Sequence, residues 1–346
     1  APLGLFLWNF IMLRQIVFLL VASVMITACS EQPPRFNHFD EGQQALSNIN
    51  NLLSNQSSSD SVTSWPFSNE YLQARHLNYQ GLKSIALDES QQAQLNYLII
   101  AERYPERYFV WPEQRDVVSR AINNKDYSAQ KLATWLELVQ TQLMQAEESS
   151  LKLNKIELKL LHSMVQNHLT NNDDEVVHSA LSKLEQYLSQ YTPRSKLGLV
   201  GLANGKDWYQ SKLNYFGAKT QPPLTWLSNI QSQLKQIAIH NVAFHLPTSH
   251  STPLVMQFFS QDENMAGLDW QLEYRDPLQS KRELSAGEQY FWLVMMETDL
   301  GIHYHTWSEQ QARVNLIKRL GVTKQEADWL IEDIILYPAT SFIFSS

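Results

Sequence analysis

Three histidines lie close together in one segment of the chain, at His240, His245 and His250. Neutral imidazoles are common zinc ligands, but a helical zinc pair needs ligands three or four residues apart so that both rings project from one face. A step of five residues points two side chains away from each other on a helix, and to opposite faces on a strand. Only a turn at Pro247 would bring His245 and His250 together. Spacing alone therefore favours structural or surface histidines over a metal site.

A second polar group lies in the segment Glu297–Trp307, with the sequence E-T-D-L-G-I-H-Y-H-T-W. We expect Asp299, just before Gly301, to end a helix, with His303 in the turn and Trp307 anchoring the next helix. The favoured interpretation is a tight corner between two helices, and the alternative is a polar site. The chain contains no glycine-rich phosphate loop, G-x-S-x-G elbow or H-E-x-x-H motif that would assign a reaction.

The elements that position these residues are predicted to be helices. Ser308 with Gln311, and Thr323 with Glu326, have the spacing of capping boxes, in which a hydroxyl and a side chain three residues later satisfy free backbone amides. The first of these helices should stop at Gly321. The second should end before Pro338, and a further helix should begin at 285.

Upstream, apolar residues recur at helical spacing over 153–165, 177–188 and 227–237, with a break at 171–174. Only residues 239–244 and 252–259 are short and rich in branched or aromatic side chains, as strands are. The sequence therefore predicts a mainly α protein, one large multi-helix domain with at most a small β element.

The N-terminus has the pattern of a lipoprotein signal. An apolar run over 16–26 leads into Ile26-Thr-Ala-Cys29, a lipobox in which the cysteine sulfur receives a diacylglycerol and the preceding peptide is removed. Cys29 is the only cysteine, so the processed chain has no disulfide, no thiolate zinc site and no cysteine nucleophile. Ser30 follows it, which favours the outer membrane over the inner one, with the chain facing the periplasm of a bacterial envelope.

The chain is thus predicted to have three parts: a signal peptide over 1–29, a disordered tether over 30–64 and a helical domain over 65–346. The tether assignment rests on the polar stretch 55–61, which has nothing to bury. Residues 1–29 contain one basic and no acidic residue, so the processed chain carries 26 basic and 35 acidic residues, a formal charge of −9. This charge, with no Lys/Arg cluster, argues against nucleic acid as a partner.

Three segments resemble motifs of the domain-of-unknown-function family 885. Residues 299–312, D-L-G-I-H-Y-H-T-W-S-E-Q-Q-A, are similar to its "D-T-G-I-H, then W-S/T-x-x-Q-A" stretch. Residues 337–344 are similar to its "P-G-Q-A-x-x-Y" element, and residues 202–209 to its "L-P-x-G-x-x-Y" segment. The resemblance implies a large helical fold like that of zinc peptidases. In typical members, H-E-x-x-P-G-H and a later E-G-W supply the zinc ligands and a glutamate that activates water.

The chain departs from the family pattern at the metal site itself. The segment in place of H-E-x-x-P-G-H is Phe244-His245-Leu-Pro-Thr-Ser-His250, so a phenylalanine replaces the first ligand and a histidine replaces the base. Ala266 stands where E-G-W has its glutamate, and Phe344 where the family has a late tyrosine. The resemblance therefore implies a degenerate, C-terminally shortened member without a metal site. The residues expected to remain in its cleft are His245, His250, Asp299, His303 and Trp307.

The sequence thus predicts a lipid-anchored envelope protein that binds a peptide or an envelope protein and has no cofactor, a pseudoenzyme rather than a hydrolase. One alternative is a divergent zinc hydrolase whose ligands come from His245, His250 and either Glu263 or Glu297. Another is a truncated gene product without function.

Overall fold

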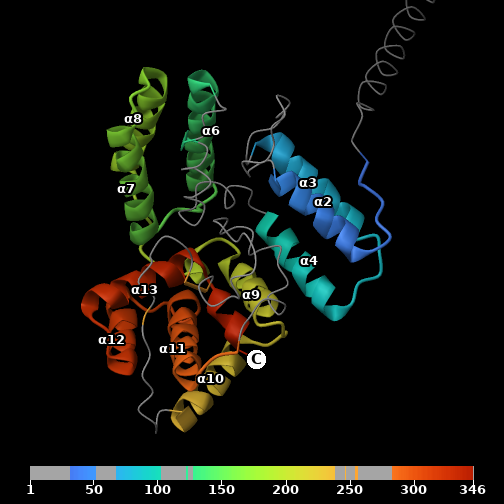
Figure 1. The fold of residues 1–346 in the computed structure, drawn as a ribbon, viewed down its shortest axis with the longest axis vertical. Coiled ribbons are helices and arrows are strands. Elements are labelled where there is room, and N and C mark those ends of the chain that lie inside the picture. The colour runs from blue at the N-terminus through green and yellow to red at the C-terminus, as the bar shows by residue number, and fades with distance from the viewer. Residues whose placement is uncertain are drawn as a thin grey trace, which may run out of the picture.

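The computed structural model describes residues 32–51, 68–102, 122–123, 128–237, 246, 254–255 and 283–345. Within these residues there are eleven α-helices and no strand, and the one β-type contact is an isolated bridge between Asn154 and Arg194. The prediction of a mainly α fold is confirmed. The described helices form three groups of consecutive elements, which Figure 1 shows from blue through green to red.

The first group consists of α2 (Phe39–Asn51), α3 (Asn69–Leu82) and α4 (Glu89–Glu102). Helix α2 lies within the segment predicted to be a disordered tether, so that prediction is wrong for residues 39–51. Phe39 and Leu46 are buried, and the Leu82 side chain of α3 occupies the space where Gly42 lacks a Cβ. This contact with α3 stabilises α2. It could not be predicted from the polar composition of residues 30–64.

The second group consists of α6 (Ala129–Glu148), α7 (Lys155–Asn171) and α8 (Glu175–Gln190), which stand side by side in Figure 1. Helix α8 packs against both of the others. The predicted break at 171–174 is confirmed, because Asp174 caps α8 by accepting from the amides of Val176 and Val177. Asn154 and Glu157 form a capping box at the start of α7.

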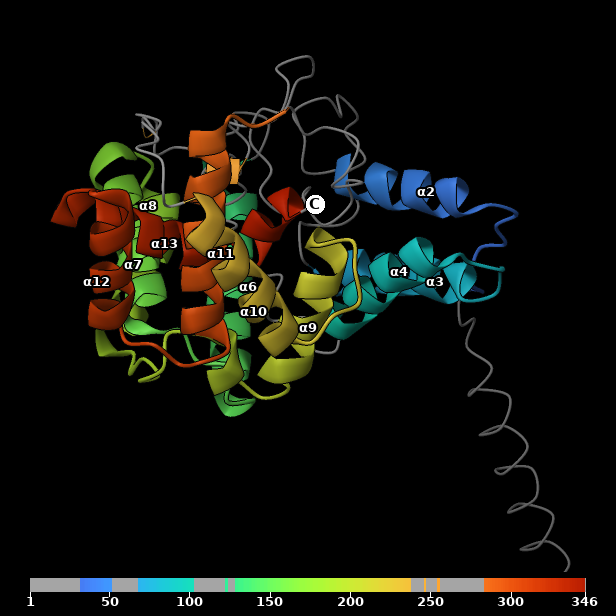
Figure 2. The ribbon, with the colours of Figure 1, turned by 90° about the horizontal axis from the view of Figure 1, so that it is seen from below.

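The third group surrounds α11. It contains the short 3-10 helix η3 (Leu199–Gly201), α9 (Gly205–Phe216), α10 (Pro223–Ile237), α11 (Ala286–His303), α12 (Glu309–Leu320), α13 (Lys324–Leu336) and the 3-10 helix η6 (Thr340–Phe344). Helix α11 packs against α10, α12, α13 and η6 (Figure 2). Every residue from Phe291 to His303 is buried, so α11 is a core helix that is enclosed on all sides.

The predicted starts of the last three helices are confirmed. Ser285, Ser308 and Thr323 each accept from the amide three residues later and form a capping box with the side chain there. Helix α12 ends at Leu320, and Gly321 follows it in the left-handed conformation with φ of 68°. Helix α13 ends at Leu336, before Pro338 as expected.

Several sequence predictions lie outside the described residues. These include the lipobox with Cys29, the histidines at 240, 245 and 250, and the strand-like segments except for Leu254 and Val255, which adopt a 3-10 turn. Among the described residues, no helix combines the length and apolar character needed to cross a bilayer.

Candidate functional site

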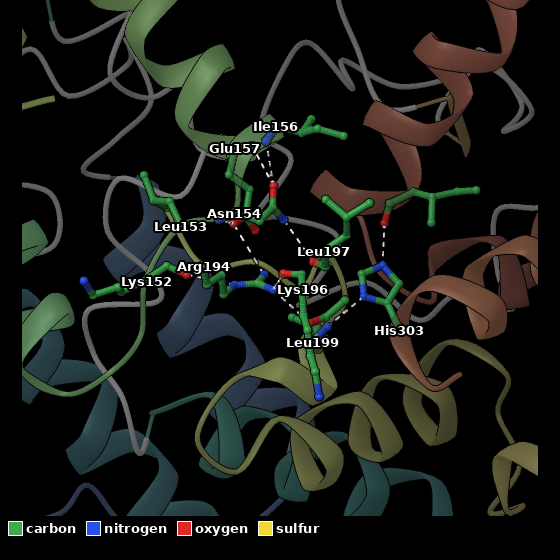
Figure 3. A network of polar contacts seen from close by, with 12 residues as sticks. Lys152, Leu153, Asn154, Ile156, Glu157, Arg194, Lys196, Leu197, Leu199 and His303 are labelled. Carbon is green, nitrogen blue, oxygen red and sulfur yellow. Dashed lines mark hydrogen bonds and ion pairs between the residues drawn. The ribbon is translucent and has the colours of Figure 1, made fainter. Parts of the chain in front are cut away.

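His303 lies at the last turn of α11 and is 1% exposed. Its Nδ1 accepts a hydrogen bond from the backbone N–H of Leu199 at 3.1 Å (Figure 3), and its Nε2 lies 3.0 Å from the carbonyl oxygen of Ile334. An amide can only donate and a carbonyl can only accept, so the ring is neutral with its proton on Nε2. The histidine therefore connects η3 to α13 through backbone groups.

Burial holds the pKa of His303 far below its usual value of 6.5, at about 3, because a buried imidazolium loses its hydration. The bond to the carbonyl of Ile334 opposes this shift, while the positive charges of Arg194 and Lys212 reinforce it. His303 is consequently neutral across the physiological range.

Asp299 lies one turn earlier on α11 and is also 1% exposed. Its Oδ1 accepts from the hydroxyl of Tyr209 at 2.5 Å, and its Oδ2 accepts from the backbone N–H of Ala339 at 2.8 Å. Ala339 has φ of 65°, a conformation that costs a non-glycine residue free energy, and the carboxyl group helps to hold that turn. Burial raises the pKa of Asp299 from 3.8 to about 7, although the bonds from Tyr209 and Ala339 oppose the shift.

Tyr209 of α9 joins these two residues. Its hydroxyl bonds to Asp299, and its ring stacks on the His303 ring with centroids 5.4 Å apart. We call Asp299, His303 and Tyr209 the α11 polar cluster. Tyr209 is not among the site residues that the sequence predicts. Its ninety-residue separation from Asp299 hides the contact from any local pattern in the sequence.

A buried lysine lies near the α11 polar cluster. Lys212 of α9 donates from Nζ to the hydroxyl of Tyr97 at 2.9 Å, and the ammonium lies 5.1 Å and 5.4 Å from the ring centroids of Tyr97 and Trp208. Such rings attract a cation through their negative faces. Lys212 was not predicted from the sequence, where it is one lysine in an ordinary helix.

A second buried network positions the backbone that meets His303. Arg194 pairs with Glu157 at 3.5 Å and donates to the carbonyl oxygens of Lys152 and Gly198 at 2.8 Å and 2.9 Å (Figure 3). Burial raises the pKa of Glu157, and the positive charge of Arg194 opposes this. The network holds the loop before η3 at Gly198, so that the backbone amide of Leu199 reaches His303.

The corner after α11 is confirmed, but Asp299 does not end the helix. The helix continues to His303, because Gly301 lies beneath the Trp307 ring, which fills the place of a Cβ. The amide of Trp307 donates to the carbonyl of Gly301 at 2.8 Å, which fixes the turn. Trp307 is therefore a structural residue of the corner. Its ring packs on the helix and replaces the side chain that Gly301 lacks.

The sequence-predicted site is only partly brought together by the described residues. Asp299 and His303 are neighbours, Trp307 packs one turn away on Gly301, and His245 and His250 lie outside the described residues. Glu297, the alternative ligand, is paired with Arg319 at 2.6 Å. In the part of the chain that the structure describes, no three His, Cys, Asp or Glu side chains gather as metal ligands would.

The chemistry open to the α11 polar cluster follows from its partners. Both ring nitrogens of His303 are engaged with backbone groups, and each oxygen of Asp299 accepts a hydrogen bond. Neither side chain has an appreciable exposed surface for a substrate. The cluster is therefore suited to hold the backbone at Leu199 and Ala339 against α11, rather than to bind a metal or transfer a proton.

Open space lies elsewhere, in two adjoining hollows between α4 and α9 with volumes of about 470 and 460 Å³. We call them together the α4–α9 groove. Side-chain amides from both helices and from the turn after α9 line it, namely Gln92, Gln94, Asn96, Gln210, Asn214 and Gln221. Gln92 already donates to Asn96, and Gln210 to Asn214, but each amide has two N–H donors and two acceptor lone pairs. The groove therefore keeps donors and acceptors for a ligand with many hydrogen-bonding groups.

Comparison of this chain with models of protein families, with curated proteins and with solved structures found no match.

Proposed function

We propose that this chain is a lipid-anchored protein of the bacterial envelope, of the family-885 type, that binds a peptide and does not cleave it. The observation that carries the proposal is the bonding of His303, whose two ring nitrogens are both occupied by backbone groups. His303 lies in the segment 299–312, which resembles family 885, and its side chain holds backbone segments of the fold together. The proposal places the anchor at Cys29 and the domain on the periplasmic side of the outer membrane.

The zinc that the family resemblance implies does not fit the described residues. A catalytic zinc site normally has three protein ligands and one open position for water. His303 offers no free lone pair, and Glu297 is held by Arg319 and by the amide of Asn315. The sequence adds Phe244 and Ala266 at the places of two family ligands. The proposed function therefore includes no metal-dependent step.

A peptide is the ligand that the α4–α9 groove favours. Peptide backbones present alternating N–H and C=O groups, and the amide side chains of the groove can pair with both. The groove also contains carboxylates at Glu89 and Asp207 and an ammonium at Lys219, so charged ends or side chains have partners. The protein's formal charge of −8 speaks against a nucleic-acid ligand.

Elemental analysis distinguishes a binding protein from a divergent hydrolase. We expect the full chain, purified in detergent without chelators, to hold zinc well below one equivalent and to cleave no member of a broad peptide library. The reason is the loss of two ligands and a base, and loss of the base alone lowers a rate by roughly a hundredfold or more. Stoichiometric zinc together with cleavage, both abolished by His250→Ala, would establish the hydrolase instead.

Acyl labelling tests the envelope assignment. We expect Cys29→Ser to abolish incorporation of a labelled fatty acid and to leave a longer, unprocessed precursor, because the sulfur is the acceptor of the lipid. Ser30→Ala is the matched control and should be labelled and processed like the natural chain. Labelling that persists in Cys29→Ser would contradict a lipid anchor at this position.

A further inference from the structure

A further pocket of about 280 Å³ lies between α10 and α11. Its floor is made of four buried side chains, Trp226, Ile230, Leu293 and Met296, and its rim is made of the exposed side chains of Lys219, Asn229, Ser232 and Gln233. We call it the α10–α11 pocket. Its volume is near the lower end of the roughly 300–1,000 Å³ usual for small-molecule sites, so it suits one residue or fragment with an apolar side chain.

Three polar atoms at this pocket have no hydrogen-bond partner in the described part of the chain. They are Oε1 of Gln221, Nε1 of Trp226 and Oγ of Ser345, and all three residues line the pocket. A buried polar atom without a partner costs about 1–3 kcal/mol, so native proteins rarely keep several together. The atoms are closed off from solvent as the side chains stand. The side chains of Gln221 and Ser345 must therefore rotate before their oxygen atoms can pair with a ligand.

The charge of the pocket is positive. Lys219 is the one ionisable side chain among its lining residues, and it forms no ion pair in the part of the chain that the structure describes. This is notable in a chain with a formal charge of −8. The ammonium of Lys219 and, once its side chain rotates, the hydroxyl of Ser345 can donate to an anion, while Oε1 of Gln221 can only accept.

These groups define a ligand with a carboxylate, an adjacent N–H donor and an apolar side chain. We propose that the α10–α11 pocket binds the C-terminal residue of a peptide, with its carboxylate toward Lys219 and its apolar side chain on the floor of Ile230, Leu293 and Met296. Lys219 and Gln221 also line the α4–α9 groove, so the groove continues from the pocket. The remainder of the peptide then lies along the groove. This inference rests on the proposed peptide-binding function and adds which end of the peptide is held.

Calorimetric titration of the full chain in detergent tests the proposal, with acetyl-Ala-Ala-Leu as the probe. The same peptide with a C-terminal amide should bind about two- to fivefold more weakly, because it lacks the charge that pairs with the exposed Lys219. Lys219→Gln should remove this difference between acid and amide. The matched control Lys235→Gln, an exposed lysine in the last turn of α10, should retain it.

A second variant tests the location without disturbing the core. Ser232 is exposed at the rim, so Ser232→Trp should fill the opening and weaken binding of the acid peptide at least tenfold while the fold is retained. Equal affinity for acid and amide, or undiminished binding to Ser232→Trp, would overturn the proposal. Free leucine should bind more weakly than the peptide. Equal binding would identify a free amino acid as the ligand and overturn the placement along the groove.

The outcomes are distinguishable from a failure of the proposed function. Missing acyl label or stoichiometric zinc would overturn the envelope-binding assignment while leaving the difference between acid and amide intact. Loss of that difference with the label present and zinc absent would overturn the pocket assignment alone.

Discussion

Asp299→Asn and His303→Gln are expected to tilt the pH dependence of the unfolding free energy in opposite directions. Asp299 has a pKa of about 7 in the folded protein, against a usual value of 3.8. Between these values the folded state keeps a proton that the unfolded chain releases. The contribution of Asp299 to stability is therefore complete below pH 3.8 and is lost as the pH rises to about 7.

His303 acts with the opposite sign. Its pKa is about 3 in the folded protein against a usual value of 6.5, so the unfolded chain takes up a proton first as the pH falls. The contribution of His303 is complete above pH 6.5 and is lost as the pH falls toward 3. Neither residue is a cause of the other's pKa shift, so each substitution leaves the other residue's pH dependence in place.

In the natural protein, Asp299 and His303 give the unfolding free energy opposite slopes against pH, and these slopes cancel between pH 3.8 and 6.5. Each slope is about 1.4 kcal/mol per pH unit. Asp299→Asn should therefore gain stability, relative to the natural protein, by roughly 3 kcal/mol between about pH 4.5 and 6.5, and His303→Gln should lose a similar amount. Both substitutions preserve hydrogen-bonding groups: the new amides can donate to Tyr209 and to the carbonyl of Ile334.

Urea unfolding at several pH values measures these slopes. His305→Gln is the matched control, because it replaces an exposed histidine two residues further on by the same residue type. The unfolding free energy of the double variant, Asp299→Asn with His303→Gln, should depend on pH in the same way as that of the natural protein. If the unfolding free energy of both single variants changed with pH in the same direction, the opposite effects of burial on Asp299 and His303 would be refuted.

Gly198→Ala is expected to destabilise the protein by roughly 3 kcal/mol or more. A Cβ at this position would overlap the carbonyl oxygen of Ile302 and lie 2.7 Å from the Cα of His303. These are backbone atoms of a buried helix, so the loop has to move away. That movement breaks the bond between the Leu199 amide and His303 and the bond from Arg194 to the Gly198 carbonyl.

Gly321→Ala is the control that separates this clash from the general cost of losing a glycine. Gly321 has φ of 68° and no atom within 4 Å of an added Cβ, so only conformational strain opposes the substitution. Its cost should be about 1 kcal/mol. Thermal or urea unfolding of both variants measures the difference. Equal losses would show that the contact between the 198 loop and α11 is loose.

Local patterns predicted the ends of helices well. The capping boxes at Ser308 and Thr323, the stop at Gly321 and the break before α8 all depend on residues within one turn of each other. Hydrogen bonds of this range are specified by sequence spacing. The mainly α class followed for the same reason, from apolar residues at a period of 3.6.

The end of α11 and the identity of α2 were not predictable in this way. Gly301 follows Asp299 closely and resembles a helix stop, but the Trp307 ring lies on it and the helix continues beneath. Helix α2 has a polar sequence and is held by α3 through Leu82 and Gly42. In both cases a contact with a residue outside the helix outweighs the local preference.

The sequence by itself determined the mainly α class, the starts of the last three helices and the break before α8, because these depend on local spacing. Only the tertiary structure decided what Asp299 and His303 do. Their pairing with Tyr209, Ala339, Leu199 and Ile334 joins segments far apart in the chain. The same residues in an open cleft would be reactive. Enclosed among backbone groups, their lone pairs and protons are already engaged, because a buried polar group is stable only when it is paired.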